Sequence, residues 1–190
     1  MKPIAVDCDG VLADFNEAFV KLVIEVTGKD LFPKWPFDIP TWEYPTYYGY
    51  TKEEQSKVWQ VIKEDRSFWF TLLPYPHTTK FLLQLRGTGR DVYFITHRMG
   101  IKAKQQTEDW LETYGYLSPT VLLSSKKACA CTAIDAGFYI DDKQENCLDV
   151  QANASDTQGF MLARPWNQTA DRIPRVDSIM EFLEVIKANG

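Results

Sequence analysis

The fold of this chain is decided by one stretch near its start, Lys2-Pro3-Ile4-Ala5-Val6-Asp7-Cys8-Asp9-Gly10-Val11-Leu12-Ala13-Asp14-Phe15. A short apolar run ends at two carboxylates, a glycine follows, and apolar residues then resume at helical spacing. This order predicts a strand, an acidic turn and a helix. Carboxylates at the carboxyl end of a strand lie where open α/β sheets bind ligands, so the turn is a candidate site. The alternative is that Asp7 and Asp9 only cap the next helix.

Length and charge limit the class of protein. The chain has 190 residues, which is enough for one substantial core with a small insertion. A formal net charge of -5 argues against a nucleic-acid polymer as partner, although a small phosphorylated substrate fits if its charge is neutralised locally. The sequence contains 4 cysteines without paired spacing and no apolar run that could span a membrane. We expect a cytoplasmic protein without a membrane partner, either a monomer or a homodimer.

From residue 75 onward, helical and extended patterns alternate regularly. The pattern predicts helices over 79–86, 101–114, 127–135, 144–152 and 177–187, and strands over 92–96, 120–124, 138–141 and 158–163. Strands joined through helices need crossover connections, which give a parallel sheet covered on both faces. We therefore expect an α/β fold in which residues 1–27 and 75–190 form a doubly wound parallel sheet.

The intervening residues 28–74 have a different composition. Four prolines stand among many aromatic residues between residues 29 and 45, which argues against a long regular element there. Thr51 and Glu54 then form a capping-box pattern, which predicts a helix ending near Asp65. These features predict that residues 28–74 form a small, mainly helical cap inserted after the first strand and helix.

Polar residues follow the predicted strands at the point where each strand ends. They are Asp7 and Asp9; Thr96 and His97; Ser124, Ser125, Lys126 and Lys127; and Asp141 and Asp142. Each has a simple structural explanation when taken alone, such as a helix cap or a solvated helix start. The carboxyl ends of parallel strands share one edge of the sheet, however, so together these residues indicate a site.

The charges at this edge indicate its chemistry. Four carboxylates placed together repel one another unless a cation lies between them. Carboxylate oxygens suit Mg²⁺, which commonly completes its shell with substrate phosphate. A lysine adds a second positive charge, and an ionised carboxylate can attack phosphorus. The sequence therefore predicts Mg²⁺-assisted phosphoryl transfer.

These residues resemble the motifs of a known family. Asp7-Cys8-Asp9-Gly10-Val11, Thr96, a lysine at 126 or 127 and Asp141-Asp142 resemble the motifs of the haloacid dehalogenase (HAD) superfamily of aspartate-nucleophile phosphatases. Three further stretches resemble its 5′(3′)-deoxyribonucleotidase branch. They are Asp9 to Phe15, Phe68-Trp69 ahead of Leu73-Pro74, and Arg164-Pro165-Trp166-Asn167.

The resemblance assigns roles to the two acids of the turn. Asp7 is expected to attack the phosphate and become an aspartyl-phosphate. Asp9 is expected to protonate the leaving oxygen and then to take a proton from the hydrolytic water. The implied Mg²⁺ ligands are Asp7, the backbone carbonyl of Asp9 and one acid of the pair Asp141 and Asp142.

The resemblance also implies the phosphate contacts. Thr96 is expected to bind the phosphate, and the family's spacing favours Lys127 over Lys126 as the lysine that holds both phosphate and nucleophile. His97 and Arg98 replace the residues that the family usually has after the threonine. His97 is therefore either a further phosphate contact or only a packed or solvated neighbour.

The aromatic residues suggest the substrate. Phe15, Phe68 and Trp69 match positions that line the nucleoside pocket in the resembled branch, although rings in this region could equally hold the cap together. The expected function is Mg²⁺-dependent hydrolysis of (deoxy)ribonucleoside monophosphates. One alternative is a phosphatase for sugar phosphates or other small phosphomonoesters. Another is a nucleotide-binding protein without catalysis.

Overall fold

The computed structural model describes residues 1–168 and 172–189, and within them it contains a six-stranded parallel sheet. The strand order is β5-β4-β1-β6-β7-β8, and every neighbouring pair is parallel. The strands are β1 (Ile4–Val6), β4 (Val92–Thr96), β5 (Thr120–Leu123), β6 (Phe138–Asp141), β7 (Gln158–Leu162) and β8 (Arg175–Val176). The strand that carries the acidic turn therefore lies in the middle of the sheet, as the doubly wound fold predicts.

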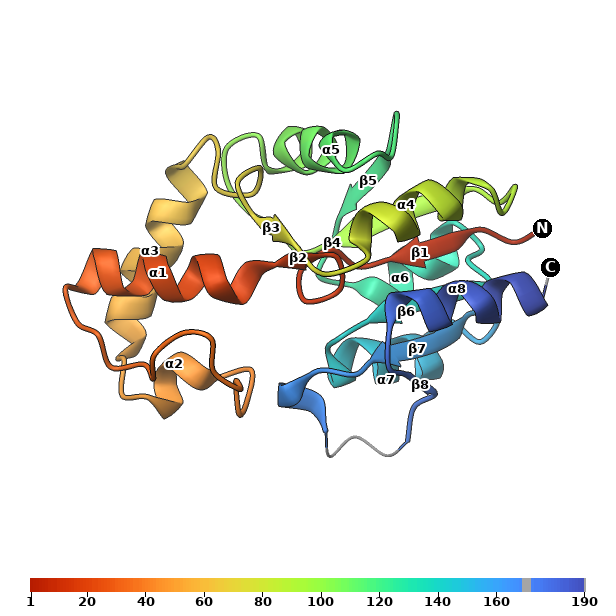
Figure 1. Ribbon diagram of the computed structural model, residues 1–190. Helices are drawn as coiled ribbons and strands as arrows, with labels where there is room; N and C mark the ends of the chain where they lie inside the picture. The colour runs from red at the N-terminus through yellow and green to blue at the C-terminus, as the bar shows by residue number, and fades with distance from the viewer. Residues whose placement is uncertain (169–171, 190) are drawn as a thin grey trace.

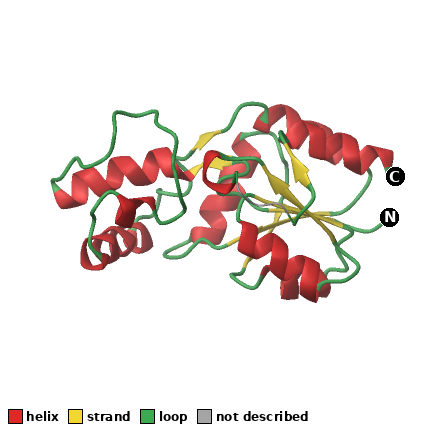
Figure 2. Cartoon of the chain, turned by 90° about the horizontal axis from the view of Figure 1, so that it is seen from below, coloured by secondary structure: helices red, strands yellow, loops and turns green. Residues whose placement is uncertain are grey.

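Helices cover both faces of this sheet (Figures 1 and 2). They are α4 (Thr78–Arg86), α5 (Ala103–Thr113), α6 (Lys127–Ala133), α7 (Gln144–Asn153) and α8 (Ile179–Ala188). The side chains of β1 alternate between the two faces, as strand geometry requires. Ile4 and Val6 belong to the core cluster that includes α4, α5 and α8, whereas Ala5 belongs to the cluster with α6 and α7. A strand buried on both faces explains the continuous apolar run before Asp7.

Three helices lie together beyond the carboxyl edge of the sheet, at the end of the molecule opposite the two termini (Figure 1). They are α1 (Phe15–Thr27), α2 (Tyr44–Tyr47) and α3 (Lys52–Glu64). The predicted capping box of Thr51 and Glu54 begins α3, and Gly28 ends α1 in the left-handed conformation. Helix α1 packs beside α3. The division into a core and a cap of residues 28–74 remains our proposal.

A short antiparallel ladder joins the two ends of this helical region. Strand β2 (Ala13–Asp14) pairs with β3 (Leu73–Pro74), and the hydroxyl of Thr78 donates to the carbonyl of Leu12 at 2.9 Å. The sequence pattern does not predict this ladder, because strands of two residues are too short to show an alternation of apolar and polar residues. A 3₁₀-helix, Pro165–Asn167, follows β7. None of the helices in the described part of the chain is both long and apolar enough to cross a membrane.

Candidate active site

The acidic turn does not serve as a helix cap. The N-cap of α1 is Asp14, whose carboxylate accepts the backbone N–H of Glu17 at 3.1 Å. The preceding turn closes on the carbonyl of Cys8, which accepts the N–H groups of Leu12 and Ala13. Asp7 and Asp9 therefore do not cap α1, which excludes the alternative that they serve only as helix caps.

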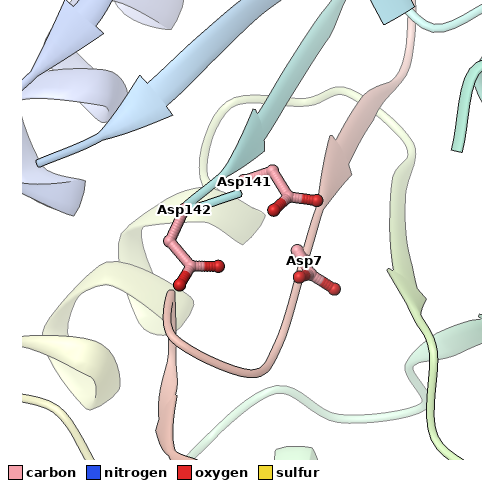
Figure 3. Close-up of side chains that lie close together, drawn as sticks. All are labelled: Asp7, Asp141 and Asp142. Atoms are coloured by element: carbon pink, nitrogen blue, oxygen red, sulfur yellow. The ribbon is translucent and has the colours of Figure 1, made fainter. Parts of the chain in front are cut away.

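Three carboxylates meet at the carboxyl ends of β1 and β6. One oxygen from each of Asp7, Asp141 and Asp142 lies within 4.8 Å of the others, and all three residues are buried. Figure 3 shows the three side chains lying close together. These strands are neighbours in the sheet, so the prediction that distant strand ends assemble one acidic cluster agrees with this geometry. Buried like charges this close favour a bound cation.

The two tandem acids differ in their hydrogen bonds. Asp141 accepts the backbone N–H of Lys143 at 2.8 Å, the amide of Asn146 at 2.9 Å and the hydroxyl of Tyr139. Asp142 accepts the indole N–H of Trp166 on Oδ2 at 2.9 Å, while its buried Oδ1 has no partner. An unpaired buried carboxylate oxygen is costly, so Asp142 is the acid of this pair with an oxygen available for a metal ion.

The absence of a side chain at Gly10 leaves room for the carboxylate of Asp142. Gly10 has a φ of +78°, and a Cβ added there would overlap the carboxylate of Asp142. Glycine is therefore required both for the left-handed backbone and for the close approach of the two loops. This contact explains in physical terms why a glycine directly follows the acidic pair in the sequence.

Burial and mutual repulsion shape the ionisation of the cluster. Burial raises the pKa of Asp7, and the neighbouring carboxylates raise it further against the opposing effect of Lys127. Burial, followed by the charges of Asp141 and Asp7, raises the pKa of Asp142 well above its usual value. Both shifts describe the protein without a cation, and a bound cation would favour the ionised carboxylates instead.

The structure brings one of the two candidate lysines into the site. Lys127 is the first residue of α6, it is buried, and its Nζ lies 2.7 Å from Oδ1 of Asp7. Burial lowers the pKa of Lys127, but the charges of Asp7 and Asp141 outweigh burial and raise it. Lys126 is exposed and does not line the cavity described below. The geometry thus favours Lys127, as the family's spacing implied.

Asp9 pairs with Arg98, a contact that nothing in the sequence indicates. The guanidinium of buried Arg98 donates to Asp9 through Nη2 at 2.7 Å and through Nε at 3.1 Å. The hydroxyl of Thr96 lies 3.4 Å from the same carboxylate. The carboxylate of Asp9 is therefore held by Arg98 and is not part of the cluster of Asp7, Asp141 and Asp142, in contrast to the predicted group of four acids. The implied metal contact through the Asp9 backbone carbonyl remains a prediction.

A cavity of about 610 Å³ opens over the acidic cluster. Asp7, Asp9, Thr96, Lys127 and the tandem acids line it together with His97, which is exposed. Phe15 and Trp69 also line it, and their rings stack with centroids 5.8 Å apart. Phe68 does not line this cavity: it packs edge-on against both rings and borders a separate, smaller hollow. Phe15 and Trp69 therefore lie at the cavity over the acidic cluster, whereas Phe68 does not, and the predicted contact of all three rings with a substrate stays a prediction.

The stretch Arg164 to Asn167 donates hydrogen bonds to both acidic loops of the site. Besides the bond from Trp166 to Asp142, the amide of Asn167 donates to the backbone carbonyl of Asp142 at 2.7 Å. Nε of Arg164 donates to the carbonyl of Gly10 at 2.6 Å. This stretch resembles the deoxyribonucleotidase branch in sequence, but nothing local in the sequence indicates which loops it contacts. The structure shows that it ties the two acidic loops together.

Comparison with known proteins identifies the family. The profile of the family described as "5' nucleotidase, deoxy (Pyrimidine), cytosolic type C protein" matches residues 1–189, nearly the whole chain. The chain belongs to this nucleotidase family. It is thus a hydrolase of the HAD-type nucleotidases, and the resemblance stated from the sequence is confirmed.

Individual relatives of the nucleotidase agree with this assignment. A Chlorobaculum tepidum protein named "Putative 5'(3')-deoxyribonucleotidase" is 29% identical, over 97% of this chain and 90% of the relative. A Bacillus cereus protein named "Putative nucleotidase" is 24% identical, over 95% and 96% of the two chains.

Solved structures share the fold of the nucleotidase at low identity. A Clostridium acetobutylicum structure described as "a predicted phosphatase" superimposes with a TM-score of 0.65 at 15% identity, over 98% of both chains. A HAD-superfamily hydrolase from Ehrlichia chaffeensis gives a TM-score of 0.60 at 13% identity, over 99% of this chain and 98% of the other. At this identity the likeness concerns the fold alone.

Proposed function

We propose that this nucleotidase hydrolyses (deoxy)ribonucleoside monophosphates with Mg²⁺, through an aspartyl-phosphate formed on Asp7. The observation that carries the proposal is the buried pair of Lys127 and Asp7, which faces Asp141 and Asp142 at the floor of an aromatic cavity. In this proposal, Asp7 is the nucleophile, the acidic cluster holds the cation, and the aromatic cavity above them accepts a flat leaving group.

The residues present fit Mg²⁺. Three buried carboxylates supply hard oxygen ligands, and Oδ1 of Asp142 has no other partner. Asp7 and Asp142 would hold the ion, with the backbone carbonyl of Asp9 as the further ligand implied by the family. When bound, the ion would neutralise charge on the phosphate oxygens.

Asp7 carries out the covalent step in this proposal. Its carboxylate oxygen forms a bond to phosphorus while the bond from phosphorus to the ester oxygen breaks, so the phosphoryl group passes to Asp7. The ammonium group of Lys127 donates a hydrogen bond to Oδ1 of Asp7. In this proposal it also donates to the phosphate oxygens and stabilises their negative charge. Water then attacks phosphorus, which releases inorganic phosphate and restores the Asp7 carboxylate.

Asp9 moves the protons. In the first step it gives a proton to the leaving ester oxygen, which becomes the nucleoside hydroxyl. In the second step it takes a proton from the attacking water and so returns to its starting state. Asp9 lines the same cavity as Asp7, and Thr96 and Arg98 fix the position of its carboxylate.

The aromatic cavity supports a nucleoside as the leaving group. Phe15, Trp59 and Trp69 line the cavity, and the ring of Phe15 is nearly parallel to each of the two indoles, with centroid distances of 5.8 Å. Such faces suit stacking of a nucleobase and keep water from a phosphoenzyme. The name of the Chlorobaculum tepidum relative is consistent with this substrate class.

A panel of phosphomonoesters tests the proposal. Purified protein is assayed for phosphate release from deoxyribonucleotides, ribonucleotides, deoxyribose 5-phosphate and glucose 6-phosphate, with Mg²⁺ or with a chelator. We expect Mg²⁺-dependent release and a kcat/KM for nucleotides at least about ten-fold above that for sugar phosphates. Equal values for both classes would favour the sugar-phosphate alternative.

A variant separates catalysis from binding. Asp7→Asn should abolish turnover but still bind nucleotide, as measured by calorimetry. Asp38→Asn, an exchange of the same kind outside the cavity, serves as the matched control and should keep wild-type activity. Phosphate release by Asp7→Asn at the wild-type rate would contradict the aspartyl-phosphate, and a wild type without turnover would favour the non-catalytic alternative.

A further inference from the structure

Several residues that line the cavity carry buried polar groups that the proposed reaction does not use. Within residues 1–168 and 172–189, the buried side-chain nitrogen and oxygen atoms without a hydrogen-bond partner are Asn16 Oδ1, Trp42 Nε1, Tyr44 Oη and Asp142 Oδ1. All four residues line the same cavity. The proposed cation explains the free oxygen of Asp142. The other three groups belong to α1, α2 and the loop before α2, and not to the sheet.

Unpaired groups of this kind indicate a ligand. Nearly all buried polar atoms in proteins have partners, because burying one without a partner is unfavourable. A substrate that fills the cavity and contacts these residues can supply the missing hydrogen bonds. Three such groups around one cavity therefore indicate that the ligand has hydrogen-bonding groups along the edge that contacts them.

The surroundings of these groups specify the kind of edge. Phe15, Phe19 and Trp59 line the same cavity, and Phe15 stacks on Trp59 with an interplanar angle of 16°. A sugar phosphate has hydroxyl groups but no flat face, and an aryl phosphate has a flat face but no polar edge. A heteroaromatic base has both, so it matches the combination of rings and unpaired polar groups.

We infer that Asn16, Trp42 and Tyr44 form the hydrogen-bonding wall of a nucleobase subsite and determine which bases are accepted. The inference rests on the proposed function and adds to it the residues that contact the base edge. The indole N–H of Trp42 can only donate, so the base must offer it an acceptor. The carboxamide of Asn16 both donates and accepts. Burial raises the pKa of Tyr44, so its hydroxyl keeps its proton for donation.

Conservative variants test each contact. Trp42→Phe and Tyr44→Phe each remove one polar group and keep a ring, and Asn16→Leu replaces the carboxamide by an apolar group of similar size. Trp35→Phe and Tyr47→Phe are matched controls from the same region whose side chains do not line the cavity. Each protein is assayed with the common deoxyribonucleoside 5′-monophosphates and with deoxyribose 5-phosphate, which lacks the base.

We expect kcat/KM for at least one nucleotide to fall roughly five- to ten-fold in each cavity variant, as for loss of one hydrogen bond. Deoxyribose 5-phosphate should be hydrolysed within about two-fold of the wild-type value, and both controls should behave as the wild type. Because these groups lack partners in the free protein, Trp42→Phe and Tyr44→Phe should not lower the melting temperature. This last readout separates base recognition from a structural role.

Equal losses for nucleotide and deoxyribose 5-phosphate would overturn the inference, as would unchanged kcat/KM values for every nucleotide. These outcomes leave the proposed function in place if the wild type still prefers nucleotides. A wild type without that preference would instead overturn the proposed function, and the inference with it. The two failures are therefore distinguished by the wild-type measurement alone.

Discussion

The guanidinium of Arg98 holds the carboxylate of Asp9, with Nη2 2.7 Å from Oδ1 and Nε 3.1 Å from Oδ2. The side chain of Arg98 is fully buried, while that of Asp9 is 18% exposed toward the cavity. Arg98 also donates to the hydroxyl of Thr107 and lies over the ring of Trp69, with its Cζ 5.0 Å from the centroid. The orientation of Asp9 is thus set by a residue that is itself fixed on several sides.

Replacing Arg98 by lysine should impair turnover more than substrate binding. An ammonium group cannot reproduce the forked contact, so Asp9 would lose its fixed orientation. We expect kcat to fall roughly ten- to a hundred-fold, the range for a misplaced reacting group, with KM little changed. Steady-state kinetics at several pH values measure both parameters.

The matched control for this exchange is Arg90→Lys. Arg90 likewise donates hydrogen bonds and lies over an aromatic ring, but its acceptors are two backbone carbonyls, its ring is that of Phe138, and it does not line the cavity. Its exchange should leave kcat unchanged. Wild-type kcat in Arg98→Lys would show that Asp9 needs no such support.

Removing the amine of Lys127 should nearly abolish activity. Lys127→Met leaves Asp7 without its 2.7 Å ion pair and the phosphate without a positive donor. We expect kcat to fall about a hundred- to a thousand-fold, as for loss of a single transition-state donor. Lys126→Met changes the exposed neighbour and should keep the wild-type rate. Reversed effects of the two variants would assign the role to Lys126.

Gly10→Ala should damage the site as well as the fold. A methyl group there must displace the carboxylate of Asp142, and the φ of +78° also disfavours alanine. Gly28 has a φ of +66° but nothing within 4 Å of an added Cβ, so Gly28→Ala isolates the backbone strain. We expect Gly28→Ala to lose about 1–2 kcal/mol of unfolding free energy with normal activity. Gly10→Ala should lose activity too, and equal activities of the two variants would contradict this.

The tandem acids should respond differently to neutralisation. In Asp142→Asn the amide oxygen would accept from Trp166, which turns the NH₂ group toward the metal position. In Asp141→Asn an NH₂ group would face one of several donors that now contact this carboxylate. Calorimetry should show Mg²⁺ affinity weakened roughly ten-fold more in Asp142→Asn, whereas Asp141→Asn should mainly lower the melting temperature. The opposite ranking would make Asp141 the direct ligand.

The stability of the metal-free protein should fall as pH rises. Burial raises the pKa of Asp7 from 3.8 to about 7, and the pKa of Asp142 is raised as well. Between pH 3.8 and about 7, the folded state binds more protons than the unfolded state. The contribution of these groups to the free energy of unfolding therefore decreases as the pH rises through this range. Mg²⁺ should therefore raise the melting temperature more at about pH 7.5 than at about pH 5.

The variant Asp142→Asn supplies the comparison for this pH dependence. It lacks one of the two carboxyl groups with raised pKa, so the pH dependence of its stability in the presence of a chelator should be shallower than that of the wild type. Equal slopes for the two proteins would show that other groups cause the effect.

The sequence by itself determined the longer helices and strands of the core and the edge of the sheet at which the strands end. Apolar periodicity and local end signals, such as the Thr51 and Glu54 capping box, are properties of neighbouring residues and can be read directly. Because parallel strands share one orientation, the order of strands and helices also predicted that Asp7, Thr96, Lys127 and Asp141 would lie at one edge. The HAD-type fold follows from this information.

Only the tertiary structure decided which atoms meet at that edge. Two adjacent lysines face different directions from a helix start, and the rotation of α6 on the sheet selects Lys127. The pairing of Asp9 with Arg98 and the unpaired atoms of Asn16 and Asp142 likewise depend on contacts between distant segments. Such contacts arise from packing across the whole core, which leaves no periodic or local signal in the chain.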